Sequence, residues 1–423
     1  MRPLSLLIAL LLLSGTGERL TACKKGGYRI NLSIDGQTTG RPVLALQKGE
    51  QISIVDSLPT IKKGSYRFKG RASLEPGQYM FVYNNRRLFH FLVSFGGYTR
   101  LDFRATIDGI RTTEVAVKGD PENRAYLDMQ RFLQDINQKP QLSEQDIERV
   151  ERYTDSVAAQ YPHTLLAILA RNIAAPPLPE LMALHDPRVL HTSILPLRLN
   201  SFFTHIVPPQ PDRIIPQIDH ILELCTDPLV KAYCGTFLLR YFLSSEIMGM
   251  ENVAVHIAQK YLDGELNTDN EELRIYLHNY VTFNESSLIG KTAPELNLPN
   301  AHGLPVSLRD MEAHYTILFF YDEDCFACKE QIPLIQQVYE KHLSKGVAVY
   351  TVYTQDREEA WLRYINDLPP EWMHVWDPDF SSGFHKLYNV TGTPRIFLLD
   401  HNKTIIGREL DAALLDLILS HQP

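Results

Sequence analysis

The first third of the chain alternates apolar and polar residues with a period of two. Short runs of this kind extend from Tyr28 to about Lys118, and turn pairs such as Asp35-Gly36 and Pro76-Gly77 separate them. Such runs, punctuated by glycine, proline and asparagine, are typical of antiparallel strands. We therefore predict an N-terminal antiparallel β-sandwich over residues 24–118, with its aromatic residues in the core.

The spacing of apolar residues becomes helical after Gly119-Asp120-Pro121-Glu122-Asn123. Stretches such as Glu144–Gln160 and Pro228–Ser245 place apolar residues on one face of a helix, and residues with turn preference lie between them. Proline pairs at Pro176-Pro177 and Pro208-Pro209 interrupt the series, because consecutive prolines forbid a continuing helix. This pattern predicts a central all-α domain over residues 119–285.

The last third alternates buried strands with helices. Tyr315–Tyr321 is a continuous apolar run, typical of a central strand covered on both faces, and a helical pattern over Cys328–His342 follows it. Val347–Thr351 and Arg395–Leu399 predict two further strands, with a crossover helix at Asp356–Asn366 after the first. We therefore expect an α/β domain over residues 286–423.

Charge and composition exclude several classes of function. The 423 residues include 42 basic and 50 acidic side chains, a net charge of −8, which argues against a protein that binds nucleic acid through a basic surface. The chain also has no glycine-rich phosphate-binding motif. We expect no nucleic-acid partner and no nucleotide chemistry.

The N-terminus has the layout of a secretory signal over residues 1–22. Arg2 precedes an apolar run from Leu4 to Leu13, which is too short to span a bilayer as a permanent helix. Leu20-Thr21-Ala22-Cys23 resembles a bacterial lipobox, and this resemblance implies a lipid on Cys23. The same resemblance implies a location in the cell envelope, in the periplasm. Lys24-Lys25 lacks the aspartate associated with inner-membrane retention, so we expect an outer-membrane lipoprotein.

The candidate chemistry lies in Cys325-Phe326-Ala327-Cys328, where a predicted strand gives way to a helix. Unpaired backbone N–H groups and the helix dipole favour a thiolate at a helix N-terminus. The first cysteine can project outward, while the second packs one turn further on. We therefore predict that Cys325 attacks and Cys328 resolves, through a mixed disulfide.

The cysteines also allow interpretations other than a redox-active pair. Zinc needs four ligands, and the sequence has no second Cys-x-x-Cys and no nearby His-x-x-x-His, so we predict no metal. A redox-inert disulfide between Cys325 and Cys328 stays open. Cys225 and Cys234 lie nine positions apart, and either a disulfide or two separate buried thiols fits that spacing.

The last third contains a set of short segments in a specific order: Gly290-Lys291-Thr292-Ala293-Pro294-Glu295, Val306-Ser307-Leu308, Cys325-Phe326-Ala327-Cys328, Pro333 and Gly392-Thr393-Pro394. Through these segments, the stretch from Leu288 to Gln422 resembles the thioredoxin-like fold, in the branch of envelope-anchored thiol-disulfide oxidoreductases. The resemblance implies that the Thr393–Pro394 bond is cis, lies against the cysteines and presents backbone to an extended substrate. We expect no dissociable cofactor, because the electrons reside in the dithiol. Residues 188–249 and 119–123 resemble parts that precede such modules in Gram-negative envelope lipoproteins.

Three positions depart from the family pattern. Asp324 stands where many relatives have tryptophan, Gln331 where many have a proton-relaying glutamate, and Phe319 where thioredoxin has a buried aspartate. The proton relay is therefore unassigned. The acidic run Asp322-Glu323-Asp324 should oppose a thiolate on Cys325 unless Asp324 caps the helix, which predicts a weakly acidic, reducing couple.

These observations predict an enzyme that reduces or exchanges disulfides of protein substrates. A membrane electron donor would have to return Cys325 and Cys328 to the dithiol after each cycle. The alternative is a non-catalytic binding or scaffold lipoprotein, whose thioredoxin-like part is a structural module.

Overall fold

The computed structural model describes residues 26–36, 40–59, 64–108, 111–141, 143–174, 176–264, 266 and 270–422. The predicted signal peptide and Cys23 lie outside these residues. The chain forms two compact units. One runs to Pro209 and includes Pro216–Phe237, and the other consists of Gln210–Ile215 and the residues from Leu238 onward. Within the described part, no helix is long and apolar enough to cross a membrane.

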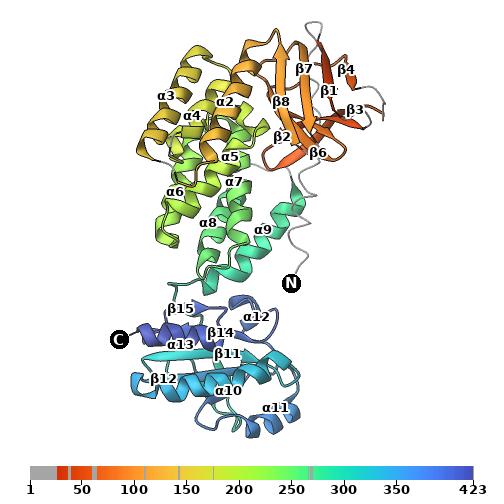
Figure 1. The fold of residues 1–423 in the computed structure, drawn as a ribbon. Coiled ribbons are helices and arrows are strands. Elements are labelled where there is room, and N and C mark those ends of the chain that lie inside the picture. Colours follow the sequence, from red (N-terminus) through yellow and green to blue (C-terminus); the bar gives the residue numbers. More distant parts are fainter. Residues whose placement is uncertain are drawn as a thin grey trace. The chain divides into compact units, whose positions relative to one another are not determined.

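Two four-stranded sheets form the N-terminal part of the first unit (Figure 1), with strand orders β4-β1-β7-β8 and β3-β2-β5-β6. The strands are β1 (Gly27–Asp35), β2 (Pro42–Lys48), β3 (Gln51–Ser57), β4 (Ser65–Gly70), β5 (Gly77–Tyr83), β6 (Arg86–Val93), β7 (Tyr98–Asp108) and β8 (Arg111–Lys118). The expectation of purely antiparallel sheets is wrong, because β1 and β7 pair in parallel, with Ile30 opposite Leu101. A period of two identifies strands but carries no information on the direction of their neighbours.

Side chains from both sheets share one hydrophobic cluster. The rings of Phe81 and Phe91 stack with centroids 5.1 Å apart, and Phe91 lies 5.0 Å from Phe103. Ile30, Leu32 and Phe68 are buried in the same cluster. Most aromatic residues of this region are therefore core residues, as predicted, whereas Phe95 and Tyr98 are exposed.

Helices follow the two sheets. They are α2 (Pro121–Asn137), α3 (Glu144–Gln160), α4 (Leu165–Ala174), α5 (Ile194–His205), α6 (Pro211–Leu224), α7 (Pro228–Leu243), α8 (Met250–Leu262) and α9 (Glu271–Asn284). The predicted helical middle region is confirmed, and its residues are divided between the two units. Helix α5 was not predicted: Pro196 lies in its first turn, and residues on several sides of it, such as Leu195, Arg198 and Phe202, are buried.

The C-terminal domain is built on a five-stranded sheet with the order β13-β12-β11-β14-β15. Its strands are β11 (Tyr315–Tyr321), β12 (Val347–Tyr353), β13 (Met373–Trp376), β14 (Arg395–Leu399) and β15 (Ile405–Arg408), preceded by the small pair β9 (Asn297–Pro299) and β10 (Pro305–Ser307). Strands β11, β12 and β13 are parallel, and β14 runs antiparallel to β11. Strand β11 is central, which explains its continuous apolar sequence.

The two faces of this sheet bury separate clusters. Ile317 and Phe319 of β11 pack in the cluster that includes residues of α10 (Phe326–Lys341) and α13 (Ala412–His421). Leu318 and Phe320 pack in a second cluster with Phe384 of α12 (Phe384–Leu387). The remaining helix is α11 (Glu358–Tyr364). Strand β13 and helix α12 were not predicted, since four residues are too few to establish a period.

Candidate active site

The two cysteines lie where β11 gives way to α10. Cys325 is the N-cap of α10, and its Sγ accepts a hydrogen bond of 3.0 Å from the Cys328 N–H. The two sulfurs are joined in a disulfide. Cys325 is partly exposed and Cys328 is fully buried, which is the arrangement expected of an attacking and a resolving sulfur. The alternative that Asp324 caps the helix is wrong, because Cys325 occupies that position.

The surroundings of Cys328 are apolar. Phe319, only 1% exposed, packs with Cys328, Ile332 and Ile396 in one cluster. A phenyl ring cannot accept a proton, so this position supplies no relay. Gln331, where relatives carry glutamate, accepts a 2.8 Å hydrogen bond from the Ala412 N–H at the start of α13. Its amide is thus part of the packing between two helices.

The loop before β14 contacts the cysteine loop through Asp322. The Thr393–Pro394 peptide bond is cis. The Thr393 hydroxyl donates a 2.6 Å hydrogen bond to Asp322 Oδ2, while Asp322 Oδ1 accepts a 2.9 Å hydrogen bond from the Asp324 N–H. Asp322 therefore joins the residue before the proline to the chain that leads into Cys325.

The other two acids of this loop contact an arginine. Arg357 Nη2 lies 2.8 Å from Glu323 Oε1 and 2.8 Å from Asp324 Oδ2. The hydrogen bond to Asp324 and the nearby Glu323 charge raise the pKa of the Arg357 guanidinium. Tyr353 of β12 donates a 2.6 Å hydrogen bond to Glu323 Oε2, and burial together with this carboxylate raises the pKa of the tyrosine. Sequence reasoning missed Arg357 and Tyr353, because they come from separate elements.

A pocket of about 470 Å³ opens beside the proline loop. Asp322 and Thr393 form one part of its wall, and Phe380, Phe384 and His385 form another. The pocket thus combines apolar ring surface with a carboxylate that is already hydrogen-bonded to the proline loop. It is a concave surface that the proline loop helps to line.

The remaining two cysteines of the described residues belong to the first compact unit. Cys225 and Cys234 are both buried and are not bonded to each other. A hydrogen bond between the thiols lowers the pKa of Cys225, and the same bond with burial raises the pKa of Cys234. Of the two open alternatives, the structure thus contains the pair of buried thiols.

Comparison with known proteins covers the domain that carries this site. Residues 289–408 match the model of the AhpC/TSA family. The chain is 24% identical over 127 residues to the thiol-disulfide oxidoreductase ResA of Bacillus thuringiensis subsp. konkukian, a match that covers 30% of this chain and 72% of ResA. It is 29% identical over 141 residues to the thiol:disulfide interchange protein DsbE of Xylella fastidiosa, covering 33% of this chain and 68% of DsbE.

A solved domain of a possible thiol-disulfide isomerase from Cytophaga hutchinsonii is 34% identical. The match covers 31% of this chain and 91% of that domain, with a TM-score of 0.30. The C-terminal α/β domain is thioredoxin-like, and its homologues are thiol-disulfide oxidoreductases. The resemblance predicted from the sequence is confirmed at this level.

Proposed function

We propose that the protein is a thiol-disulfide oxidoreductase that acts on protein disulfides through Cys325 and Cys328. The observation that carries the proposal is the pairing of a partly exposed helix-capping sulfur with a buried one, bonded to each other beside a cis-proline loop. Family membership of the C-terminal domain supports the reaction class.

The reaction follows from the positions of the two sulfurs. In the dithiol form, the Cys325 thiolate attacks one sulfur of a substrate disulfide, and the other substrate sulfur leaves as a thiolate that takes up a proton. Cys328 then loses its proton and attacks Cys325, which releases the second substrate sulfur. The substrate gains two electrons and two protons, and the enzyme is left with the Cys325–Cys328 disulfide. A membrane electron donor would return those two electrons.

Substrate backbone would align along the loop at Thr393 and Pro394. Proline lacks an N–H, so the chain before it presents its carbonyl without a competing donor on Pro394. The hydrogen bond from Thr393 to Asp322 supports this role, because it fixes the loop relative to the chain that carries Cys325. Neither the attack by Cys325 nor the attack by Cys328 requires a dissociable cofactor.

We also propose a cell-envelope location, with a lipid on Cys23 that anchors the periplasmic protein to the outer membrane. The lipobox-like Leu20-Thr21-Ala22-Cys23 carries this part of the proposal. In cells, the full chain is then expected to sediment with membranes, and Cys23→Ser to leave it in the soluble fraction; equal sedimentation of both chains would contradict the anchor.

Reduction of insulin by the full chain, with dithiothreitol as electron source, tests the catalytic proposal. The wild-type chain should accelerate precipitation of the insulin B chain, and Cys325→Ser should reduce the rate to that of dithiothreitol alone. Equal rates for both proteins would favour the scaffold alternative.

A further inference from the structure

The acidic residues that precede Cys325 present an electrostatic problem for the proposed reaction. Two carboxylates at positions 323 and 324 lie directly before the attacking sulfur in the chain. A negative charge near a thiol disfavours its thiolate, and only the thiolate attacks a disulfide. The helix N-terminus at Cys325 acts in the opposite direction. How readily the Cys325 thiol ionises therefore depends on whether the two carboxylates are paired with a positive charge.

A single arginine pairs with both carboxylates. Arg357 Nη2 is 2.8 Å from Glu323 Oε1 and 2.8 Å from Asp324 Oδ2, so one guanidinium bridges the two acids. The Glu323 side chain is 13% exposed, and Tyr353 fixes its second oxygen from β12. Arg357 itself is the residue before α11, so the contact joins the start of that helix to the cysteine loop.

Other charged and titratable groups lie on the elements next to the cysteine loop. Asp322 already accepts hydrogen bonds from Thr393 and from the Asp324 N–H. Arg395, at the start of β14, pairs with Glu409. The titratable groups on the adjoining elements include Lys329 and Glu330 of α10, Tyr353 of β12, Glu358, Glu359, Arg363 and Tyr364 of α11, and His385 and Lys386 of α12. Among the described ion pairs, Arg357 makes the contacts with Glu323 and Asp324.

We propose that Arg357 is a positioning residue for the dithiol reaction, which by pairing with Glu323 and Asp324 offsets part of their negative charge beside Cys325 and sets how readily that thiol ionises. The proposal rests on the proposed oxidoreductase function and assigns a regulating charge to the same site. Asp324, which stands where many relatives carry tryptophan, is tolerated beside the attacking sulfur because Arg357 accompanies it.

The size of the effect follows from Coulomb's law with partial solvent screening. Loss of one positive charge within about 10 Å of the sulfur, at an effective dielectric constant between that of a protein surface and that of water, raises the pH midpoint of ionisation by about 0.5 to 1 unit. At pH 7 that shift lowers the fraction of Cys325 present as thiolate about three- to tenfold. Because the side chains of Arg357 and Asp324 are 48% and 73% exposed, 1 M salt should reduce the difference.

The test is the pH profile of Cys325 alkylation in the reduced full chain. Brief exposure to iodoacetamide, followed by mass spectrometry of the peptide that contains Cys325, separates this thiol from Cys225 and Cys234. In Arg357→Gln we expect the midpoint to rise by about 0.5 to 1 pH unit. Arg363→Gln is the matched control, because Arg363 lies in α11, the helix that follows Arg357, is exposed and donates a hydrogen bond to the Glu359 carbonyl.

Neutralising the acids provides the rescue. Adding Glu323→Gln and Asp324→Asn to Arg357→Gln should return the midpoint to the wild-type value or below it, because the triple variant carries no charge at these three positions; a merely structural role of Arg357 would not produce this return. If Arg357→Gln does not fold, Glu323→Gln with Asp324→Asn in the presence of Arg357 should lower the midpoint instead.

The proposal would be overturned by an unchanged midpoint in Arg357→Gln together with an unchanged midpoint in the double variant Glu323→Gln with Asp324→Asn. An equal shift in Arg363→Gln would also overturn it. The alkylation profile needs no turnover, so it separates this proposal from the oxidoreductase function: a chain that fails to reduce insulin can still show the Arg357 effect.

Discussion

At the scale of single residues, Gln331 shows how a side chain at a catalytic position of the family can have a structural role. Its Oε1 accepts the Ala412 N–H at 2.8 Å, which satisfies a backbone donor in the first turn of α13. The side chain of Cys328 lies in an apolar cluster one turn away along α10. A carboxamide does not exchange protons near neutral pH, so Gln331 is unsuited to a relay.

We therefore expect Gln331→Ala to lower the free energy of unfolding by about 0.5 to 1.5 kcal/mol, because the Ala412 N–H loses its partner. Insulin reduction should stay close to the wild-type rate. Urea unfolding followed by tryptophan fluorescence measures the first effect, since all three tryptophans lie in the C-terminal domain. Gln337→Ala, at an exposed position of the same helix, is the control. A large loss of turnover without a loss of stability would instead assign Gln331 a catalytic role.

The sequence predicted the residues whose positions depend on local spacing. Cys325 and Cys328 are one helical turn apart, so their exposed and buried positions follow from the helix that contains them. Arg357 could not be found in this way. It meets Glu323 and Asp324 only because β12 lies parallel to β11, which brings the ends of both strands to the same edge of the sheet.

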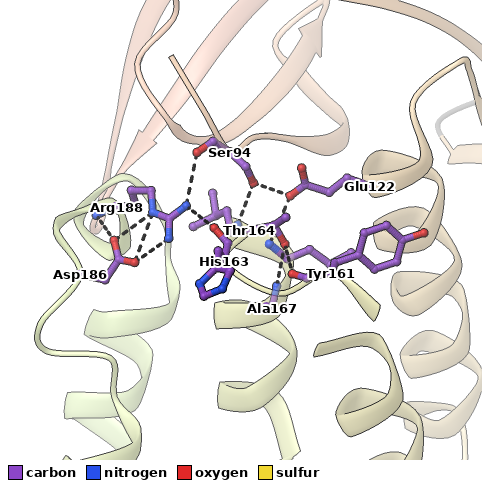
Figure 2. A network of polar contacts seen from close by, with 10 residues as sticks. Ser94, Glu122, Tyr161, His163, Thr164, Ala167, Asp186 and Arg188 are labelled. Carbon is purple, nitrogen blue, oxygen red and sulfur yellow. Dashed lines mark hydrogen bonds and ion pairs between the residues drawn. The ribbon is translucent and has the colours of Figure 1, made fainter. Parts of the chain in front are cut away.

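At the scale of elements, a polar network joins a strand end to two helix starts in the first unit (Figure 2). Ser94 follows β6, accepts a 2.7 Å hydrogen bond from the Leu165 N–H at the start of α4, and donates to Glu122 in the first turn of α2. Arg188 donates to the backbone carbonyls of Ser94 and His163 and pairs with Asp186. The network satisfies backbone groups that would otherwise be buried without partners.

Glu122 makes this network sensitive to pH. Burial raises the pKa of its carboxyl, and the hydrogen bonds from Ser94 and the Leu166 N–H oppose the rise only in part. The folded state thus holds the proton more tightly than the unfolded state, so stability falls as the pH rises from the ordinary glutamate range through the folded pKa.

Glu122→Gln should remove this dependence, because a carboxamide keeps an accepting oxygen and carries no charge. We expect the variant to lose less stability than the wild-type chain between pH 4.5 and pH 8, as measured by urea unfolding with circular dichroism. Glu148→Gln, at an exposed position of α3, should behave like the wild-type chain. A variant that loses as much stability as the wild-type chain over this interval would show that Glu122 does not titrate there.

Elements with a sustained apolar pattern were predictable, and pairing between distant strands was not. The apolar run Tyr315–Tyr321 predicted β11 with the bounds that the structure has. The alternation of Tyr28–Ile34 identified β1, but its parallel pairing with β7 depends on where the chain returns after four strands of the other sheet and β4. Such a return is a property of the whole domain and leaves no local signal.

At the scale of the whole molecule, the matched family covers residues 289–408 of 423. The sheets and helices of the first unit have their own core and their own polar network. Substrate chemistry is therefore assigned to the C-terminal domain alone, and the boundaries 24–118, 119–285 and 286–423 stay predictions. The account depends on Cys325 forming a covalent bond with a substrate sulfur.

The most direct measurement is capture of that bond. In Cys328→Ser the resolving sulfur is absent, so attack by Cys325 on insulin should stop at a mixed disulfide. The account predicts an adduct that dithiothreitol releases, that mass spectrometry assigns to Cys325, and that is lost in Cys325→Ser with Cys328→Ser. No adduct at Cys325, or an adduct only at Cys225 or Cys234, would contradict it.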